Sequence, residues 1–261
     1  HKVARSYVLY RAERARLRAE KTASQPQKQT TDHGIKVTLD DGTQKPLDFK
    51  RLQKIVDEAC RGLSDTDGAW ILEETRRNLF DGVPEKDVAP ALLMAARTRI
   101  EQEPNYSFVT ARLLLDSMRS EALGFLGYGR KEATQAEMQD LYGEYFADFV
   151  KRGAELELLS AELTRYDLKR LGAALRPDRD LNFNYLGLQS LYDRYFIHSN
   201  GVRFELPQAF FMRVAMGLAM NEIDREGRAI EFYNLLSSFD FMSSTPTLFN
   251  SGTLRPQLSS C

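Results

Sequence analysis

The sequence predicts a mainly helical protein with a small amount of β-structure. Apolar residues recur at helical spacing over most of the chain, and strict apolar–polar alternation occurs only near residues 35–39. Glycine and proline residues separate the helical segments. The 261 residues are enough for one large domain or two small ones.

Composition excludes several classes of protein. Charged residues make up 28% and hydrophobic residues 43%, as in ordinary globular proteins, and the formal net charge of −1 provides no basic field to recruit nucleic acid. No apolar run reaches the roughly 18–20 residues of a membrane span, and the opening segment lacks the apolar core of a signal peptide. Cys60 and Cys261 are too few for a disulfide framework, so we expect a reducing, cytoplasmic compartment. His1, His33 and His198 lack metal-ligand spacing.

The first half of the chain divides into three segments. Residues 1–21 are expected to form a solvated helix, and residues 22–34 have the polar composition of a linker. In residues 35–126, a strand is followed by the hairpin signal Asp41-Gly42, a second strand ending at Pro46, and Asp48 as the N-cap of a helix. Further helices are expected at 66–80, 86–102 and 105–123, so this unit is predicted to be a small sheet capping a helical bundle.

Residues 127–261 are predicted to be helical from 134 onward. A polar turn is expected at Asp178-Arg179-Asp180, and helices are expected at 181–197, 208–220 and 224–238. The segment from residue 244 onward has lost all helical period. Cys60 shares a helical pattern with Ile55, Val56 and Ala59 and is interpreted as a core residue. The aromatic residues of the second half are also interpreted as core or interface residues: Phe183, Tyr185, Tyr192, Tyr195 and Phe196.

The C-terminal segment carries a family resemblance. STPTLFNSGT at residues 244–253 and RPQLSSC at residues 255–261 resemble the start of the active site in the large subunit of ribonucleotide reductase. Upstream, the DRDL sequence at 178–181 and the ELPQ sequence at 205–208 resemble the helical region that precedes the barrel of this family. Residues 127–261 are therefore expected to be the helical N-terminal region of the reductase α/β barrel domain. The His1 and Cys261 termini both resemble cuts, so we expect an N-terminal fragment of a longer subunit that is inactive alone.

The resemblance implies a substrate and partners. The substrate would be a ribonucleoside diphosphate, the radical would come from a small partner subunit, and thioredoxin or glutaredoxin would restore the thiols of a homodimer or higher oligomer. Helices at 134–200 would lie near the dimer contacts. Cys261 would be one member of the reducing thiol pair, and its partner and the thiyl-radical cysteine would lie downstream. The candidate substrate-binding residues are Thr245, Thr247, Ser259 and Ser260.

The residue types agree with this chemistry. A loop of small hydroxyl side chains can surround a diphosphate with O–H and N–H donors, and Gly252 allows the backbone to approach closely. Two thiols that become a disulfide deliver the two electrons that reduce a ribose carbon. By composition alone the segment could be a Ser/Thr-rich surface loop, and Cys261 alone could be an inert thiol. The ordered motif ending in Ser-Ser-Cys favours the active-site interpretation.

Residues 35–126 resemble an ATP-cone, a regulatory domain that binds ATP or dATP as effectors. A weak internal repeat between residues 4–14 and 111–122 suggests that residues 1–21 are the last helix of a preceding cone. The cone departs from its family at the expected Lys-Arg-Asp-Gly, where Leu39-Asp40-Asp41-Gly42 stands, and at Ala89-Pro90 and Arg119-Ser120-Glu121. A carboxylate facing phosphate costs several kcal/mol. We therefore expect a degenerate cone that does not bind the effectors of the parent enzyme. The remaining possible phosphate partners are Lys36, Lys45, Lys50, Arg51 and Lys54.

Other functions remain open at the level of sequence. A cobalamin-dependent reductase shares the C-terminal motif. ATP-cones also occur in transcriptional repressors, which carry a four-cysteine zinc ribbon that this sequence lacks. A nucleotide-sensing module without catalysis and a plain helical interaction module are the alternatives. Neither requires a Ser-Ser-Cys sequence.

Overall fold

The computed structural model describes residues 34–129, 132–255 and 257–259, and the chain from Lys36 onward belongs to one compact unit. The mainly helical fold class with small sheets is confirmed. The predicted helix 1–21 and residues 22–33 of the predicted linker lie outside the described residues. The predicted domain boundary at residue 126 stays a prediction.

The N-terminal sheet of this unit contains the predicted hairpin and one strand that the sequence did not reveal. β1 (Lys36–Thr38) pairs antiparallel with β2 (Gln44–Pro46), and the turn places Gly42 at φ +81°. On its other edge β1 pairs in parallel with β3 (Val83–Pro84). Two residues that include a proline give no alternating pattern, so β3 could not be predicted.

The next three helices follow the predicted order with shorter bounds. Asp48 caps α2 (Phe49–Cys60), as predicted, because its carboxylate accepts a 2.9 Å hydrogen bond from the Arg51 amide. The predicted 66–80 helix is α3 (Gly68–Asn78). α4 (Val88–Arg97) is shorter than the predicted 86–102 helix at both ends. It follows a 3-10 turn, η1 (Glu85–Asp87), and beyond Arg97 the amides bond three residues back, which tightens the last turn.

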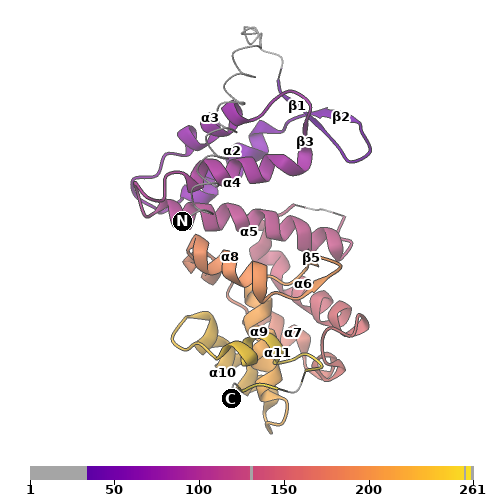
Figure 1. The fold of residues 1–261 in the computed structure, drawn as a ribbon. Coiled ribbons are helices and arrows are strands. Elements are labelled where there is room, and N and C mark those ends of the chain that lie inside the picture. The colour runs from indigo at the N-terminus through magenta and orange to yellow at the C-terminus, as the bar shows by residue number, and fades with distance from the viewer. Residues whose placement is uncertain (1–33, 130–131, 256, 260–261) are drawn as a thin grey trace, which may run out of the picture. The chain divides into compact units, whose positions relative to one another are not determined.

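α5 (Tyr106–Phe125) lies between α4 and α8 (Figure 1) and contributes to two hydrophobic clusters. Val109 and Leu113 face the cluster formed with the sheet and α2–α4. Leu115 and Met118 face the second cluster, formed with the helices that follow. Both faces of this helix are therefore apolar and buried, which is the sequence signature of a helix that passes through a core.

The second half of the chain is a set of helices around that second cluster (Figure 1). α6 begins with a complete capping box, in which Thr134 and Glu137 bond each other's backbone amides. The elements in order are α6 (Gln135–Glu155), η2 (Ala161–Arg165), α7 (Leu168–Ala174), η3 (Pro177–Asn182), α8 (Tyr185–Arg194), β4 (His198–Ser199), β5 (Val202–Arg203), α9 (Pro207–Ala219), α10 (Arg225–Ser237) and α11 (Thr245–Asn250). Pro207 is the first residue of α9, as the sequence predicted.

Three predictions in this half were wrong. The predicted 181–197 helix is interrupted, because η3 continues to Asn182 and α8 begins only after Asn184, whose side chain caps it at Gly187. The predicted polar turn at 178–180 lies inside η3, and Asp180 is buried rather than solvent-facing. The segment from 244 onward is not entirely irregular, because residues 245–250 form α11.

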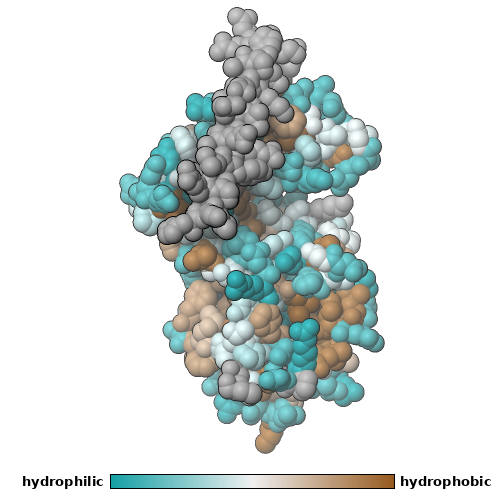
Figure 2. Space-filling model, viewed as in Figure 1, coloured by the Kyte–Doolittle hydropathy of each residue, from teal (hydrophilic) through white to brown (hydrophobic). Residues whose placement is uncertain are grey.

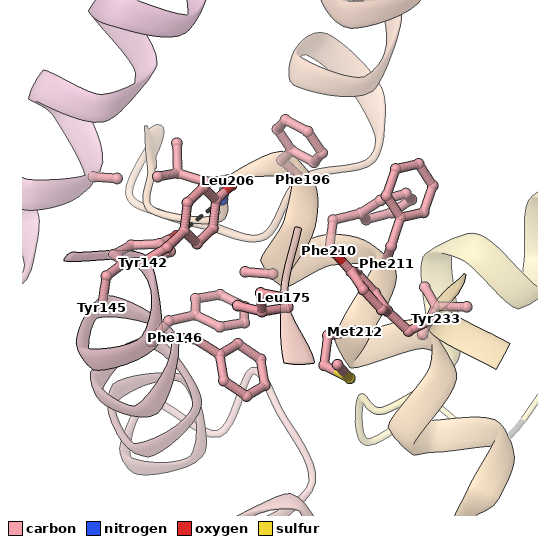
Figure 3. Close-up of a cluster of buried hydrophobic side chains, with 14 of the residues drawn as sticks. Tyr142, Tyr145, Phe146, Leu175, Phe196, Leu206, Phe210, Phe211, Met212 and Tyr233 are labelled. Atoms are coloured by element: carbon pink, nitrogen blue, oxygen red, sulfur yellow. Dashed lines mark hydrogen bonds between the residues drawn. The ribbon is translucent and has the colours of Figure 1, made fainter. Parts of the chain in front are cut away.

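Aromatic side chains fill the second cluster (Figure 3). Phe183 stacks against Phe211 with ring centroids 6.2 Å apart. The hydroxyl of Tyr145 donates to the Phe204 carbonyl at 2.6 Å and accepts from the Leu206 amide at 2.9 Å. Burial of each large apolar side chain contributes about 1.5–3 kcal/mol. The predicted aromatic residues are accordingly core residues: Phe183 and Phe196 are buried, and Tyr185, Tyr192 and Tyr195 pack against the cluster.

A buried polar network ties η3 to α6, α9 and α10. Gln208 donates to the Asp180 carboxylate at 2.7 Å, and the hydroxyl of Tyr233 donates to the Gln208 side-chain carbonyl at 2.6 Å. The Tyr142 hydroxyl bonds the same carboxylate and accepts from the Gln208 amide. Each member therefore has a partner, as buried polar groups require. Burial raises the pKa of Asp180 to about 6 from its ordinary value of 3.8.

The surface of the helical half is partly apolar. On the face shown in Figure 2, hydrophobic residues are more frequent over the part formed by the later helices. Several large apolar side chains near the C-terminal end are exposed: Leu235, Phe239, Phe241, Met242 and Leu254. No helix in the described part of the chain combines the length and the apolar character that a bilayer crossing requires.

The position of Asp180 predicts a distinctive pH dependence of stability. Between pH 3.8 and about pH 6 the folded state binds the Asp180 proton more tightly than the unfolded state. The free energy of unfolding of the wild-type protein should therefore fall, relative to Asp180→Asn, as the pH rises through this window, by on the order of 2 kcal/mol. Above pH 6 the difference should stay level. Urea denaturation of both proteins at several pH values measures it; a difference independent of pH would contradict the assignment.

Candidate active-site segment

The C-terminal motif forms a short helix followed by a return of the chain. Thr245 is exposed at the start of α11, and Thr247 is half-buried one residue before Leu248, which enters the core. The hydroxyl of Thr247 donates to the Leu258 carbonyl at 2.6 Å, and Asn250 donates to the Gln257 carbonyl at 2.6 Å. These bonds bring the 245–247 turn and the segment around Ser259 together. Ser260 and Cys261 lie outside the described residues.

Tyr195 also contacts this segment, which the sequence did not indicate. Its hydroxyl oxygen lies 3.3 Å from Thr245 Oγ1, and its ring stacks on Phe249 with centroids 4.5 Å apart. Tyr195 closes α8, so this helix supports α11 from one side. A tyrosine three residues before a hairpin gives no sequence signal for this role.

A fully buried ion pair holds the other side of the segment. Arg213 of α9 donates through Nε to Glu205 Oε1 at 2.7 Å, and both side chains are fully inaccessible. Arg213 Nη1 donates to the Ser251 carbonyl at 2.7 Å, and both Nη groups reach the Leu248 carbonyl at 3.3 Å. Losing one partner of a buried pair leaves an uncompensated charge and costs about 3–5 kcal/mol. Sequence reasoning missed this pair, although an arginine within the apolar run FFMRVAM is a signal that could have found it.

Close backbone packing places the segment directly on α9. Ser251 donates through its hydroxyl to the Val214 carbonyl at 2.7 Å, and the Gly252 carbonyl accepts from the Ser160 amide at 2.9 Å. A Cβ atom on Gly217 would lie 2.1 Å from the Gly252 amide nitrogen, a distance that no real contact permits. Gly252 itself has φ +76°, so glycine is required there for its backbone as well.

The described residues contain no group of three or more His, Cys, Asp or Glu side chains gathered as a metal site needs. His198 lies exposed in β4, and His1 and His33 lie outside the described residues. The described side chains near α11 include the hydroxyls of Thr245 and Thr247, which can form hydrogen bonds. Hydroxyl groups and backbone N–H groups can donate hydrogen bonds to an anion such as a phosphate group.

Comparison with known proteins identifies the family. The family model described as "Ribonucleotide reductase, all-alpha domain" matches residues 181–256, which contain α8 to α11 and the Glu205–Arg213 pair. The chain is 42% identical over 262 aligned residues, 99% of its length, to the "Ribonucleoside-diphosphate reductase subunit alpha" of Chlamydia trachomatis. The chain belongs to the ribonucleotide reductase family. The alpha subunit of Helicobacter pylori is 35% identical over 87% of this chain, and the large subunit of Danio rerio is 32% identical over 85%.

The chain spans about a quarter of the length of these reductase relatives: 24% of the Chlamydia protein and 27% of the other two. The alignments nevertheless cover most or all of this chain. Both residues 35–126 and the all-alpha region at residues 181–256 therefore have counterparts in reductase large subunits.

Within residues 35–126, most of the candidate phosphate partners already form ion pairs with carboxylates of the chain. Lys45 pairs with Glu85 at 2.6 Å, and Lys54 pairs with Glu137 at 3.2 Å. Arg51 pairs with Asp116 at 2.6 Å and with Glu132 at 3.1 Å. Lys36 and Lys50 are exposed. A cation that pairs within the chain is less available to a phosphate group.

The side chains at the C-terminal end of α5 also contact other residues of this chain. Arg119 is buried and donates to the Ala133 carbonyl at 3.4 Å and to the Gln135 side chain. Glu121 accepts from the Tyr192 hydroxyl at 2.6 Å. Cys60 packs, half-buried, against the N-terminal cluster, and burial raises the pKa of its thiol, in agreement with the predicted structural role.

Proposed function

We propose that this chain is part of the large subunit of a ribonucleoside-diphosphate reductase and contributes the first part of its substrate site. Thr245, Thr247, Ser259 and Ser260 would bind the diphosphate of the substrate through side-chain hydroxyl or backbone N–H groups. Cys261 would be one of the two thiols that reduce the ribose. The family and the C-terminal motif both support this proposal.

The observation that carries the proposal is the bond from the Thr247 hydroxyl to the Leu258 carbonyl. It joins two hydroxyl-bearing segments that stand eleven residues apart in the chain. A diphosphate has several oxygens that need donors from more than one direction, and two converging segments can supply them. A Ser/Thr-rich surface loop without a ligand needs no such convergence and no buried anchor beneath it.

The proposed reaction balances with two thiols. The C2′–O bond of the ribose breaks, a C2′–H bond forms, and the oxygen leaves as water. Two thiols supply the two electrons and become a disulfide. A small partner subunit would generate the radical that starts the reaction, and thioredoxin or glutaredoxin would reduce the disulfide after each turnover. The working enzyme would be a homodimer or higher oligomer.

Regulation of the parent enzyme by ATP and dATP belongs to the same proposal, but residues 35–126 are proposed to bind them weakly or not at all. Asp40 stands where a phosphate-binding cone places a cation, and its charge repels phosphate. Lys45, Arg51 and Lys54 are engaged by carboxylates of the chain itself. Diffuse attraction to exposed lysines is screened by salt.

The role of Cys261 is tested by Cys261→Ser in the full-length parent protein. The hydroxyl preserves the shape of the pocket but cannot form a disulfide. We expect loss of multiple turnover with a thioredoxin-type reductant and near-normal binding of the ribonucleoside diphosphate. Cys60→Ser, which changes the other cysteine, is the matched control and should retain activity. Steady-state turnover by the Cys261→Ser enzyme would refute the assignment.

The degenerate cone is tested by calorimetric titration of the 261-residue chain with dATP at ~0.15 M salt. We expect no stoichiometric binding in the micromolar range, because the chain offers a carboxylate and an apolar side chain where phosphate needs cations. The variant Leu39→Lys/Asp40→Arg restores the family pattern and should bind more tightly than the wild type. Circular dichroism checks that both proteins are folded. Stoichiometric micromolar binding to the wild-type chain would make this cone a working sensor.

A further inference from the structure

We propose that Arg213, held in place by Glu205, is a positioning residue for the substrate-binding segment. This inference rests on the proposed function, because it assigns a role to the same site. Arg213 lies on α9 and contacts the segment through backbone carbonyls, so it acts on the substrate through the hydroxyl residues that it positions. The pair sits beneath α11 rather than at the exposed Thr245 side chain.

The guanidinium group of Arg213 uses both of its edges. One edge meets the Glu205 carboxylate, through Nε at 2.7 Å and through Nη2 at 3.3 Å. The other edge meets the carbonyls of Leu248 and Ser251. All three nitrogens therefore have acceptors, and the planar group fixes the angle between its two sets of partners. A lysine in the same place could approach Glu205 but could not span both edges.

Glu205 is itself fixed, so the anchor does not move with the segment. Its Oε2 accepts from the Ile197 amide at 2.8 Å, and its neighbours Phe204 and Leu206 are bonded to the Tyr145 hydroxyl. The two carbonyls on the other edge come from the end of α11, where carbonyls have no partner within the helix. Arg213 thereby connects the aromatic core to the end of α11.

The anchored carbonyls are adjacent to the proposed substrate-binding groups. Leu248 directly follows Thr247, whose hydroxyl bonds the Leu258 carbonyl one residue before Ser259. Any movement of the Leu248 carbonyl therefore shifts both hydroxyl-bearing segments together. Gly217, one turn further along α9, limits the same movement by close packing, because it allows Gly252 to approach α9. Arg213 and Gly217 are two independent determinants of one position.

Two matched pairs of variants of the full-length parent protein test the proposal. Arg213→Lys keeps the positive charge but loses the planar guanidinium group that bonds partners on two edges. The control Arg119→Lys makes the same change at a buried arginine of α5 that does not contact the segment. Gly217→Ala forces the segment from α9, and Gly124→Ala adds a methyl group on α5 where no atom lies within 4 Å. The readouts are KM for the ribonucleoside diphosphate, kcat, and the midpoint of thermal unfolding. Hydrogen exchange of residues 245–255 is measured in the 261-residue chain.

We expect Arg213→Lys and Gly217→Ala to raise KM and to lower kcat/KM by about 10- to 100-fold, because a misplacement near 1 Å can cost on the order of 100-fold in rate. Exchange should accelerate in residues 245–255 and stay unchanged in residues 36–60. Arg119→Lys and Gly124→Ala should leave KM and the exchange of the segment unchanged, even where the unfolding midpoint shifts. An unchanged KM with unchanged exchange in Arg213→Lys would overturn the proposal, as would an equal rise of KM in Arg119→Lys.

Failure of the proposed function gives a different result. A wild-type parent protein without turnover would contradict the reductase proposal, whereas the exchange of residues 245–255 would still report whether Arg213 positions the segment. Should Arg213→Lys fail to fold, Gly217→Ala provides the same test without any change of charge. An unaltered KM and unaltered exchange in folded Gly217→Ala would then count against the proposal.

Discussion

The fully buried pair of Glu205 and Arg213 is the interaction on which the C-terminal half of this chain depends. Two charges without water are tolerated only when every charged atom has a close partner. Glu205 has the Ile197 amide and Arg213; Arg213 has Glu205 and two carbonyls of the C-terminal segment. The same pair therefore fixes the loop before α9 and the end of α11. The aromatic core around the pair is closely packed, and the ion pair holds the end of α11 at a defined position against that core.

A second constraint joins the two halves of the described chain through α5. This helix contributes one face to the cluster formed with the sheet and α2–α4, and the other face to the second cluster, formed with the helices that follow. Two ion pairs reinforce the connection. Arg51 of α2 pairs with Glu132, just before α6, and Lys54 pairs with Glu137 in the first turn of α6. The cations that a nucleotide-binding cone would direct at phosphate thus serve, in this chain, in contacts between its own segments. The proposed loss of effector binding and the internal pairing would be two consequences of the same residues.

Much of the fold could be predicted from local signals. The hairpin at Asp41-Gly42, the cap at Asp48 and the start of α9 at Pro207 depend on residues close in sequence, and all three are confirmed. The errors have a common origin in tertiary contacts. Asp180 was predicted to lie in a polar turn, but it is buried, and Gln208 and Tyr142 satisfy it inside the core. The motif predicted that Thr247 and Ser259 belong to one site. The arginine in the apolar run FFMRVAM marks Arg213 as unusual, but its contacts with the end of α11 come from the tertiary structure.

The central claim is that two hydroxyl-bearing segments, anchored on α9 by Arg213, receive the diphosphate of a ribonucleotide. The most direct measurement is a crystal structure of the full-length parent protein with a ribonucleoside diphosphate bound. We predict phosphate oxygens within about 2.5–3.2 Å of the Thr247 and Ser259 hydroxyl or amide groups, with Arg213 still bonded to Glu205 and to the Ser251 carbonyl. A nucleotide bound elsewhere, with no phosphate contact to either segment, would contradict the account.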